Sequence, residues 1–196
     1  MFANRFTALV DACALAGALK RNLLLTLAEA EFFRLRWSET ILDETEAAIA
    51  AMLGAKGLTD ATERAARSRR AMVAAFEEAC IDDVGSMMGS VPDLPDPNDR
   101  HVVAAALKTR ASVIVTDNLK DFPPRILAPL NLEARSADAF IADTIALDPG
   151  RAVFAIRRMR ERFRKPGKTP EILLLDMEAA GLTETVDVLK PHVLSL

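Results

Sequence analysis

The chain has 196 residues, a formal net charge of −3 and a hydrophobic share of 51%. This length can bury the core of one domain with an extension, or of two small domains. The acidic balance gives no whole-molecule reason to expect nucleic acid, so that case depends on local clusters. No apolar run approaches the roughly 20 residues that span a bilayer, and residues 1–5 lack a signal-peptide pattern. We therefore expect a cytoplasmic protein that does not enter a membrane.

The cysteines and histidines are too few for several kinds of site. Cys13 and Cys80 cannot form a disulfide framework, and we expect both to be small buried side chains. With His101 and His192 as the only histidines, a zinc centre or a histidine-based triad would lack ligands.

Strand and helix patterns alternate through most of the chain. Apolar runs at 7–11 and 111–116 predict buried strands, and residues 33–37 and 132–135 predict two shorter ones. Helical patterns lie between them, at 14–30, 38–54, 60–79 and 98–109 and from Ser136 onward, with residues 60–63 resembling a capping box. Residues 81–97 predict strand fragments within loop. This alternation predicts an α/β fold of three layers, with a short parallel sheet between helices.

The composition changes near residues 148–150, so we expect a core domain at 1–146 and a helical extension at 147–196. The extension begins with an arginine-rich helix, is interrupted at 165–168 and ends in two shorter helices. Residues 151–168 carry eight basic side chains and a single acid, Glu161. These are candidates for RNA phosphate contacts: Arg157, Arg158, Arg160, Arg162 and Arg164, with Arg100 as a further one. The alternative is a solvated helix that docks through Ile156, Met159 and Phe163.

Four acidic positions lie where strands end or where helices begin or border the core. Asp11 and Asp117 each follow a buried strand, Asp99 lies in the first turn of its helix, and Glu44 borders an apolar helix face. Because parallel strands end at one edge of a sheet, we expect these carboxylates to converge there. Taken singly, any acid can instead be a surface charge or a helix cap, as we expect for Asp96.

Converging carboxylates repel one another unless a cation lies among them. Oxygen ligands without histidine or cysteine select hard ions, so the expected cofactor is Mg²⁺ or Mn²⁺. Such ions assist hydrolysis at phosphate, which makes metal-dependent phosphodiester cleavage the reaction class that fits.

Four segments, in this order, resemble the PIN-domain family, in particular its branch of VapC-type toxin ribonucleases with a C-terminal helical extension: residues 9–11, 41–44, 96–106 and 113–123. The resemblance covers about residues 5–145, and its most specific part joins the Asp-Arg-His helix to the Val-Thr-Asp-Asn-Leu-Lys-Asp-Phe-Pro segment. It implies an endoribonuclease that depends on Mg²⁺ or Mn²⁺, as the toxin of a type II toxin–antitoxin pair. The implied partners are an RNA substrate, a small antitoxin protein and, since dimers are usual in the family, a second copy.

The resemblance also implies which residues form the site. Three near-constant acids correspond to Asp11, Glu44 and Asp99, and a fourth falls within residues 116–118. The family's Thr-x-Asp reads Thr-Asp-Asn here, so we expect Asp117 to be the fourth ligand. The expected supporting residues are Thr116, Asn118 and Asp121.

Two departures from the family pattern leave other functions open. The family has Asn two residues after its first Asp, where this chain has Cys13, and Asn118 takes the usual acid position. Both fit a non-catalytic PIN-like module that binds RNA or a protein. A haloacid-dehalogenase-type phosphatase is a weaker rival because it needs an Asp at position 13. His101 lies two residues after Asp99 in the chain. Its side chain can either contact a phosphate or pack in the core.

Overall fold

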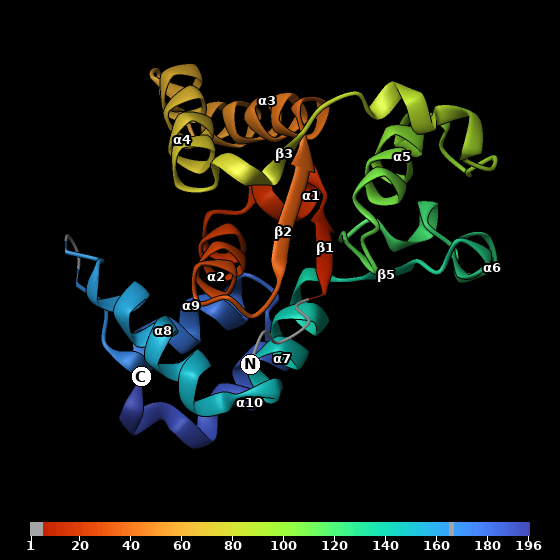
Figure 1. The fold of residues 1–196 in the computed structure, drawn as a ribbon. Helices are drawn as coiled ribbons and strands as arrows, with labels where there is room; N and C mark the ends of the chain where they lie inside the picture. The colour runs from red at the N-terminus through yellow and green to blue at the C-terminus, as the bar shows by residue number, and fades with distance from the viewer. Residues whose placement is uncertain (1–5, 165–166) are drawn as a thin grey trace.

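The computed structural model describes residues 6–164 and 167–196, and within them the chain forms a five-stranded parallel sheet (Figure 1). The strand order is β3-β2-β1-β4-β5. The strands are β1 (Thr7–Val10), β2 (Arg34–Ser38), β3 (Cys80–Ile81), β4 (Val113–Val115) and β5 (Glu133–Arg135). The predicted α/β class with a short parallel sheet is confirmed.

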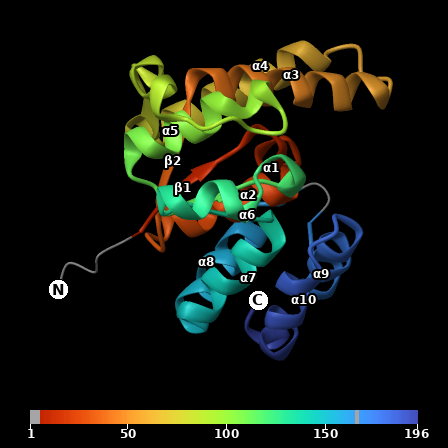
Figure 2. The ribbon, with the colours of Figure 1, turned by 90° about the vertical axis from the view of Figure 1, so that its right-hand side faces the viewer.

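The sheet is parallel because each crossover carries helices that cover its faces. The helices are α1 (Ala12–Ala16), α2 (Ala18–Glu29), α3 (Glu39–Ala55), α4 (Ala61–Ala75), α5 (Arg100–Thr109), α6 (Pro124–Leu127), α7 (Ala137–Leu147), α8 (Pro149–Glu161), α9 (Pro170–Ala179) and α10 (Thr183–Leu189). Short 3₁₀ helices are η1 (Glu77–Ala79), η2 (Val84–Ser90), η3 (Pro97–Asp99), η4 (Leu119–Asp121), η5 (Ala128–Leu130) and η6 (Lys190–Ser195). Figure 2 shows α3, α4 and α5 on one side of the strands, with α2, α7 and α8 on the other.

The core forms where both faces of the central strands are covered. Leu9 in β1 pairs in register with Arg36 of β2 and Ile114 of β4, and both Leu9 and Ile114 are fully buried. A strand covered on both faces carries an apolar run instead of an alternating one, which explains residues 8–10. β2 alternates instead, and its Trp37 is fully buried.

Three helices differ from the sequence-based expectation in where they break or how they begin. The helix expected at 14–30 is two helices, because Gly17 is extended (φ −70°, ψ 120°) and Arg21 donates to the carbonyls of Leu15 and Ala16 that end α1. The expected capping box at 60–63 is wrong, since the Asp60 carboxylate accepts from Arg64 Nε at 2.8 Å instead of capping α4. The helix expected from 98 begins as the 3₁₀ turn η3 and becomes α-helical only at residue 100.

The carboxyl-terminal helices pack against one another and against the sheet's helices. Helix α7 contacts α2, α8 and α10, and α8 lies along α2. The boundary that we predict after residue 146 is not tested by these contacts and stays a prediction. Residues 1–5 and part of the expected interruption, residues 165 and 166, lie outside the described residues. No described helix is both long and apolar enough to cross a bilayer.

Candidate metal centre

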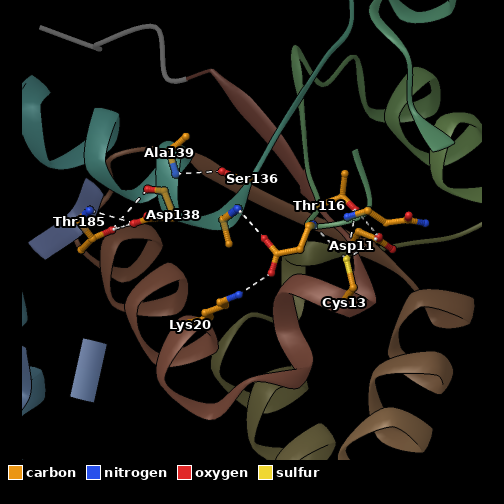
Figure 3. Close-up of polar contacts among 11 residues, drawn as sticks. Asp11, Cys13, Lys20, Thr116, Ser136, Asp138, Ala139 and Thr185 are labelled. Atoms are coloured by element: carbon orange, nitrogen blue, oxygen red, sulfur yellow. Dashed lines mark hydrogen bonds and ion pairs between the residues drawn. The ribbon is translucent and has the colours of Figure 1, made fainter. Parts of the chain in front are cut away.

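Asp11 lies at the junction of β1 and α1, where it is only 6% exposed. Its amide donates to the carbonyl of Val115, which holds the end of β1 against β4. Its carboxylate accepts hydrogen bonds from the Ala12 amide (2.7 Å), the Thr116 hydroxyl (2.8 Å) and the Cys13 thiol (3.1 Å). Figure 3 shows Asp11, Cys13 and Thr116 together. These donors compensate for the burial of the charge and fix its position.

The loop after β4 connects Asp11 to a second acid. Thr116 is fully buried, and its hydroxyl accepts a hydrogen bond from the Asn118 amide at 3.1 Å. The side-chain amide of Asn118 in turn donates to Asp99 Oδ2 at 3.3 Å. A continuous series of polar contacts therefore runs from Asp11 to Asp99 across the carboxyl ends of β1 and β4, the edge at which open α/β sheets bind ligands.

Three carboxylates meet at this edge. Asp96, Asp99 and Asp121 each offer an oxygen, and these oxygens lie within 4.8 Å of one another. Burial, together with the negative charges of Asp11, Asp96 and Asp121, raises the pKa of Asp99 to about 6. A cation would relieve this repulsion. Because all three candidate ligand atoms are carboxylate oxygens, the group fits a hard divalent ion such as Mg²⁺ or Mn²⁺.

Asp96 has two roles in the structure. Its Oδ1 accepts from the Asn98 amide at 2.9 Å, so the expected helix cap is confirmed. It also belongs to the three-carboxylate group, which the sequence pattern did not indicate.

Glu44 contacts the site by way of the side chain of His101. It is exposed on α3, and its Oε1 lies 3.1 Å from Nε2 of His101 on α5. The His101 imidazole lies near enough to Asp99 to oppose the rise in that carboxyl's pKa. Glu44 is not part of the three-carboxylate group, and its predicted role as a ligand stays a prediction.

Asp117 is turned toward other elements. Its Oδ2 lies 2.6 Å from Lys20 Nζ of α2, and its Oδ1 accepts from the Ala137 amide at 3.1 Å, where α7 begins. A dashed line from Lys20 in Figure 3 marks the ion pair. Asp121, which we expected only as a supporting residue, instead lies beside Asp99 because the turn η4 directs the chain back to the edge. Its position shortly after Thr116 was the sequence signal for it.

Cys13 takes the place of the family's Asn. The expectation that both cysteines are buried is wrong, since Cys13 is exposed overall and Cys80 is half-buried. The Cys13 sulfur nevertheless lies inward, where it contacts Asp11 and accepts from the Asp117 amide at 3.2 Å. Burial of the sulfur and, to a smaller extent, the negative charge of Asp11 raise the pKa of Cys13 to about 11. Cys13 is therefore a neutral thiol at pH 7, a donor and not a nucleophile.

The arginines that we expected to meet RNA lie in two places. Arg100 donates to the carbonyls of Met88 and Val91 and so holds η2 against α5. The others lie on or just after α8, which Figure 1 shows at the opposite end of the molecule from α3 and α5. They are therefore remote from the acidic edge.

Comparisons with known proteins agree with this architecture. The family model described as "PIN domain" matches residues 7–120, more than half of the chain, so the chain belongs to the PIN-domain family. A second model, described as "VapC50 C-terminal domain", matches residues 137–191. The suspected resemblance is thereby confirmed.

A curated relative has a name that describes an activity. The protein named "Putative ribonuclease VapC50" from Mycobacterium tuberculosis is 42% identical to this chain over 76 residues. The match covers 39% of this chain and 45% of that protein, so it spans less than half of the relative's length. No solved structure matches.

Proposed function

We propose that this protein is a divalent-metal-dependent endoribonuclease of the VapC type, the toxin of a type II toxin–antitoxin pair. The observation that carries the proposal is the group of Asp96, Asp99 and Asp121 oxygens within 4.8 Å of one another, beside Asp11. Negative neighbours that raise the pKa of Asp99 in this way favour a bound cation. Membership of the PIN-domain family and the relative's ribonuclease name support the reaction class.

In this proposal the acids are the ligands and their polar neighbours support them. Asp11 and Asp99 hold the ion, with Asp121 and Asp96 as further oxygen donors and Glu44 and Asp117 as the ligands that the family resemblance adds. Mg²⁺ or Mn²⁺, when bound, would supply positive charge for the phosphate and lower the pKa of water. Thr116 orients Asp11, Asn118 orients Asp99, and His101 orients Glu44 through the contacts described above.

The test is cleavage of a labelled single-stranded RNA with Mg²⁺, with Mn²⁺ and with EDTA. We expect cleavage only with metal, and a fall of about 100-fold or more for Asp11→Asn and for Asp99→Asn. The matched control is Asp82→Asn, because Asp82 is exposed and lies outside the carboxylate group. If both site variants cleave as fast as the wild type, the proposed chemistry is wrong.

A second candidate is a non-catalytic PIN-like module that binds RNA or a protein. Cys13 and Asn118, which replace the family's usual residues, are the observations in its favour. Calorimetric titration with Mn²⁺ separates the two candidates. Saturable binding that Asp99→Asn removes supports the enzyme, whereas RNA binding without metal binding or cleavage supports the module.

The partners and location also belong to the proposal. A toxin of this type would be cytoplasmic and would pair with a small antitoxin, encoded by a short neighbouring reading frame. Co-expression followed by purification tests the pair, and size-exclusion chromatography with light scattering tests the expected homodimer.

A further inference from the structure

Helix α8 directs its arginines to two separate flanks. Its buried residues, among them Ile156 and Met159, dock it against α2 and its neighbours. On one flank, Arg157 pairs with Glu161 at 3.0 Å, and Arg160 donates to the Lys168 carbonyl. The other flank faces α2 and carries Arg151, Phe154, Arg158 and Arg162, spaced three or four residues apart along one stripe.

This second flank forms one wall of a groove. Thr26 and Glu29 of α2 form the facing wall, and the groove has a volume of about 340 Å³. Small-ligand sites occupy about 300–1,000 Å³, so the groove has room for a single base or group of that size. We call it the α2–α8 groove.

The groove carries a positive charge on a chain that is negative overall. Three guanidinium groups line it against the single carboxylate of Glu29. The Arg162–Glu29 pair is long, at 3.4 Å, and about 58% exposed, so exchanging that carboxylate for a phosphate costs little. Within residues 6–164 and 167–196, Arg158 forms no ion pair. Arg151 is held in place by the Phe32 ring, 4.1 Å from its Cζ, and its exposed pair with Asp148 is long, at 3.7 Å.

Phe154 lies in the middle of these charges and is 61% exposed. Its ring contributes little to the core, and a base could stack on it. Arginine lies about one helical turn to either side, at positions 151 and 158, so that cations flank the aromatic face. Aromatic rings with flanking cations are the arrangement by which proteins bind single-stranded nucleic acid without reading its sequence.

A protein partner fits the groove less well than RNA does. Stable protein interfaces need an apolar core within about 1,200–2,000 Å² of buried surface. Here Phe154 is the exposed large apolar side chain of the wall, and the other lining residues are charged or polar except for the small Ala30 and Ala155. Stacking of one base requires only that ring.

We propose that the α2–α8 groove binds a single-stranded segment of RNA outside the cleavage site, with a base stacked on Phe154 and adjacent phosphates on Arg151, Arg158 and Arg162. RNA as the ligand rests on the function proposed above. Because α8 and the acidic edge lie at opposite ends of the molecule, the groove contributes to affinity and not to the chemical step (Figure 1).

Binding can be measured without cleavage. Fluorescence anisotropy with a fluorescein-labelled 20-nucleotide single-stranded RNA of mixed sequence, in EDTA, gives the Kd of the full chain across a range of salt concentrations. We expect Phe154→Ala to raise Kd about 5-fold or more, as base stacking predicts. Arg158→Ala should also raise Kd and should lower the slope of log Kd against log salt by about 0.7.

Two matched controls separate the groove from general effects. Leu175→Ala removes an apolar side chain of similar exposure (63%) on α9, and Arg67→Ala removes an exposed arginine on α4 that is paired with Glu63. Both should leave Kd nearly unchanged. Unchanged Kd for Phe154→Ala and Arg158→Ala, or equal losses in the controls, would overturn the proposal. Loss of antitoxin binding without loss of RNA binding would do the same and would assign the groove to a protein.

Steady-state cleavage distinguishes this inference from the proposed function. Phe154→Ala should raise KM and leave kcat unchanged. If the wild type cleaves RNA and the variant's KM and Kd do not change, the groove proposal fails and the enzyme stands. If no cleavage occurs but the variant binds RNA more weakly, the groove proposal stands and the enzyme fails.

Discussion

Two aspartates, the buried Asp138 on α7 and the partly buried Asp99 before α5, are surrounded by groups of opposite kind. Asp138 on α7 is 9% exposed and accepts hydrogen bonds from the amides of Glu184 and Thr185 and from the Thr185 hydroxyl. Figure 3 shows the Asp138–Thr185 contacts, well apart from Asp11. Asp99, by contrast, lies beside the carboxylates of Asp96 and Asp121 and accepts one hydrogen bond among the described residues, from the Asn118 side-chain amide. Donors make Asp138 a structural link between α7 and α10, whereas like charges make Asp99 a candidate ligand.

Burial of an acid therefore does not by itself indicate a functional site. What distinguishes the two positions is the sign of the groups around each carboxylate. Substitutions at these aspartates and at the residues that contact the acidic edge test that difference.

Asp138→Ala should lower the free energy of unfolding by about 3 kcal/mol, because it leaves the buried donors of Thr185 and Glu184 without their acceptor. Urea denaturation measures the loss, and Mn²⁺ affinity should not change. Asp187→Ala, at an exposed position on α10, is the control and should cost less than about 0.5 kcal/mol. A loss equal to that of the control would show that Asp138 does not link the two helices.

His101→Ala should reduce RNA cleavage about 10-fold or more, because Glu44 loses the imidazole 3.1 Å away that orients it. His101→Gln, which keeps a donor near Glu44, should retain more activity than His101→Ala. The control is His192→Ala on η6. Equal activity of His101→Ala and the wild type would remove the orienting role, while equal losses for the Ala and Gln variants would indicate a packing defect.

Asp99→Asn should stabilise the metal-free protein at pH 7.5 by on the order of 1 kcal/mol, after allowance for solvent screening. The pKa of Asp99 is raised from 3.8 to about 6 in the folded chain, so folding favours its neutral form. The stabilising contribution of that protonation is present below about pH 4 and is lost as the pH rises through 6.

The advantage of Asp99→Asn should accordingly shrink when urea denaturation is repeated at pH 4.5. The variant should also lose the Mn²⁺-induced rise in Tm that we expect for the wild type. Asp82→Asn should match the wild type in each measurement. A destabilised Asp99→Asn at pH 7.5 would mean that its neighbours do not repel it.

Asp117→Asn should have the smallest effect, a loss of about 1 kcal/mol or less, because it weakens an ion pair with Lys20 and a contact with the α7 amide. If these contacts are its whole role, Mn²⁺ affinity measured by calorimetry will not change. A fall of about 10-fold or more would instead support Asp117 as a ligand.

The positions of β1 and β4 and of the acids Asp11 and Asp99 follow from patterns that are local in the sequence. Apolar runs specify β1 and β4, and an acid directly after a strand or at a helix start must lie at the carboxyl edge. The break at Gly17 was not predictable from helix propensity, because Arg21 stabilises it by donating to carbonyls that a longer helix would have used.

The choice between Asp117 and Asp121 depends on contacts between distant parts of the chain. Residue 117 turns toward Lys20 and the first amide of α7, and no property of the segment 113–123 specifies those partners. Asp121 reaches Asp99 because η4 reverses the chain after Asn118. Side-chain direction in a loop is set by tertiary contacts, whereas strand and helix periodicity is set locally.

Asp117 connects the loop after β4 to the start of α7, and this has a practical consequence for truncated chains. Its carboxylate anchors the first turn of α7, while the residues on either side of it, Thr116 and Asn118, hold Asp11 and Asp99. Removing the chain from residue 137 onward would delete that anchor and leave the loop tethered by Lys20. A fragment shortened in this way would therefore start with a loosened loop, even though Asp11 and the three-carboxylate group are still present.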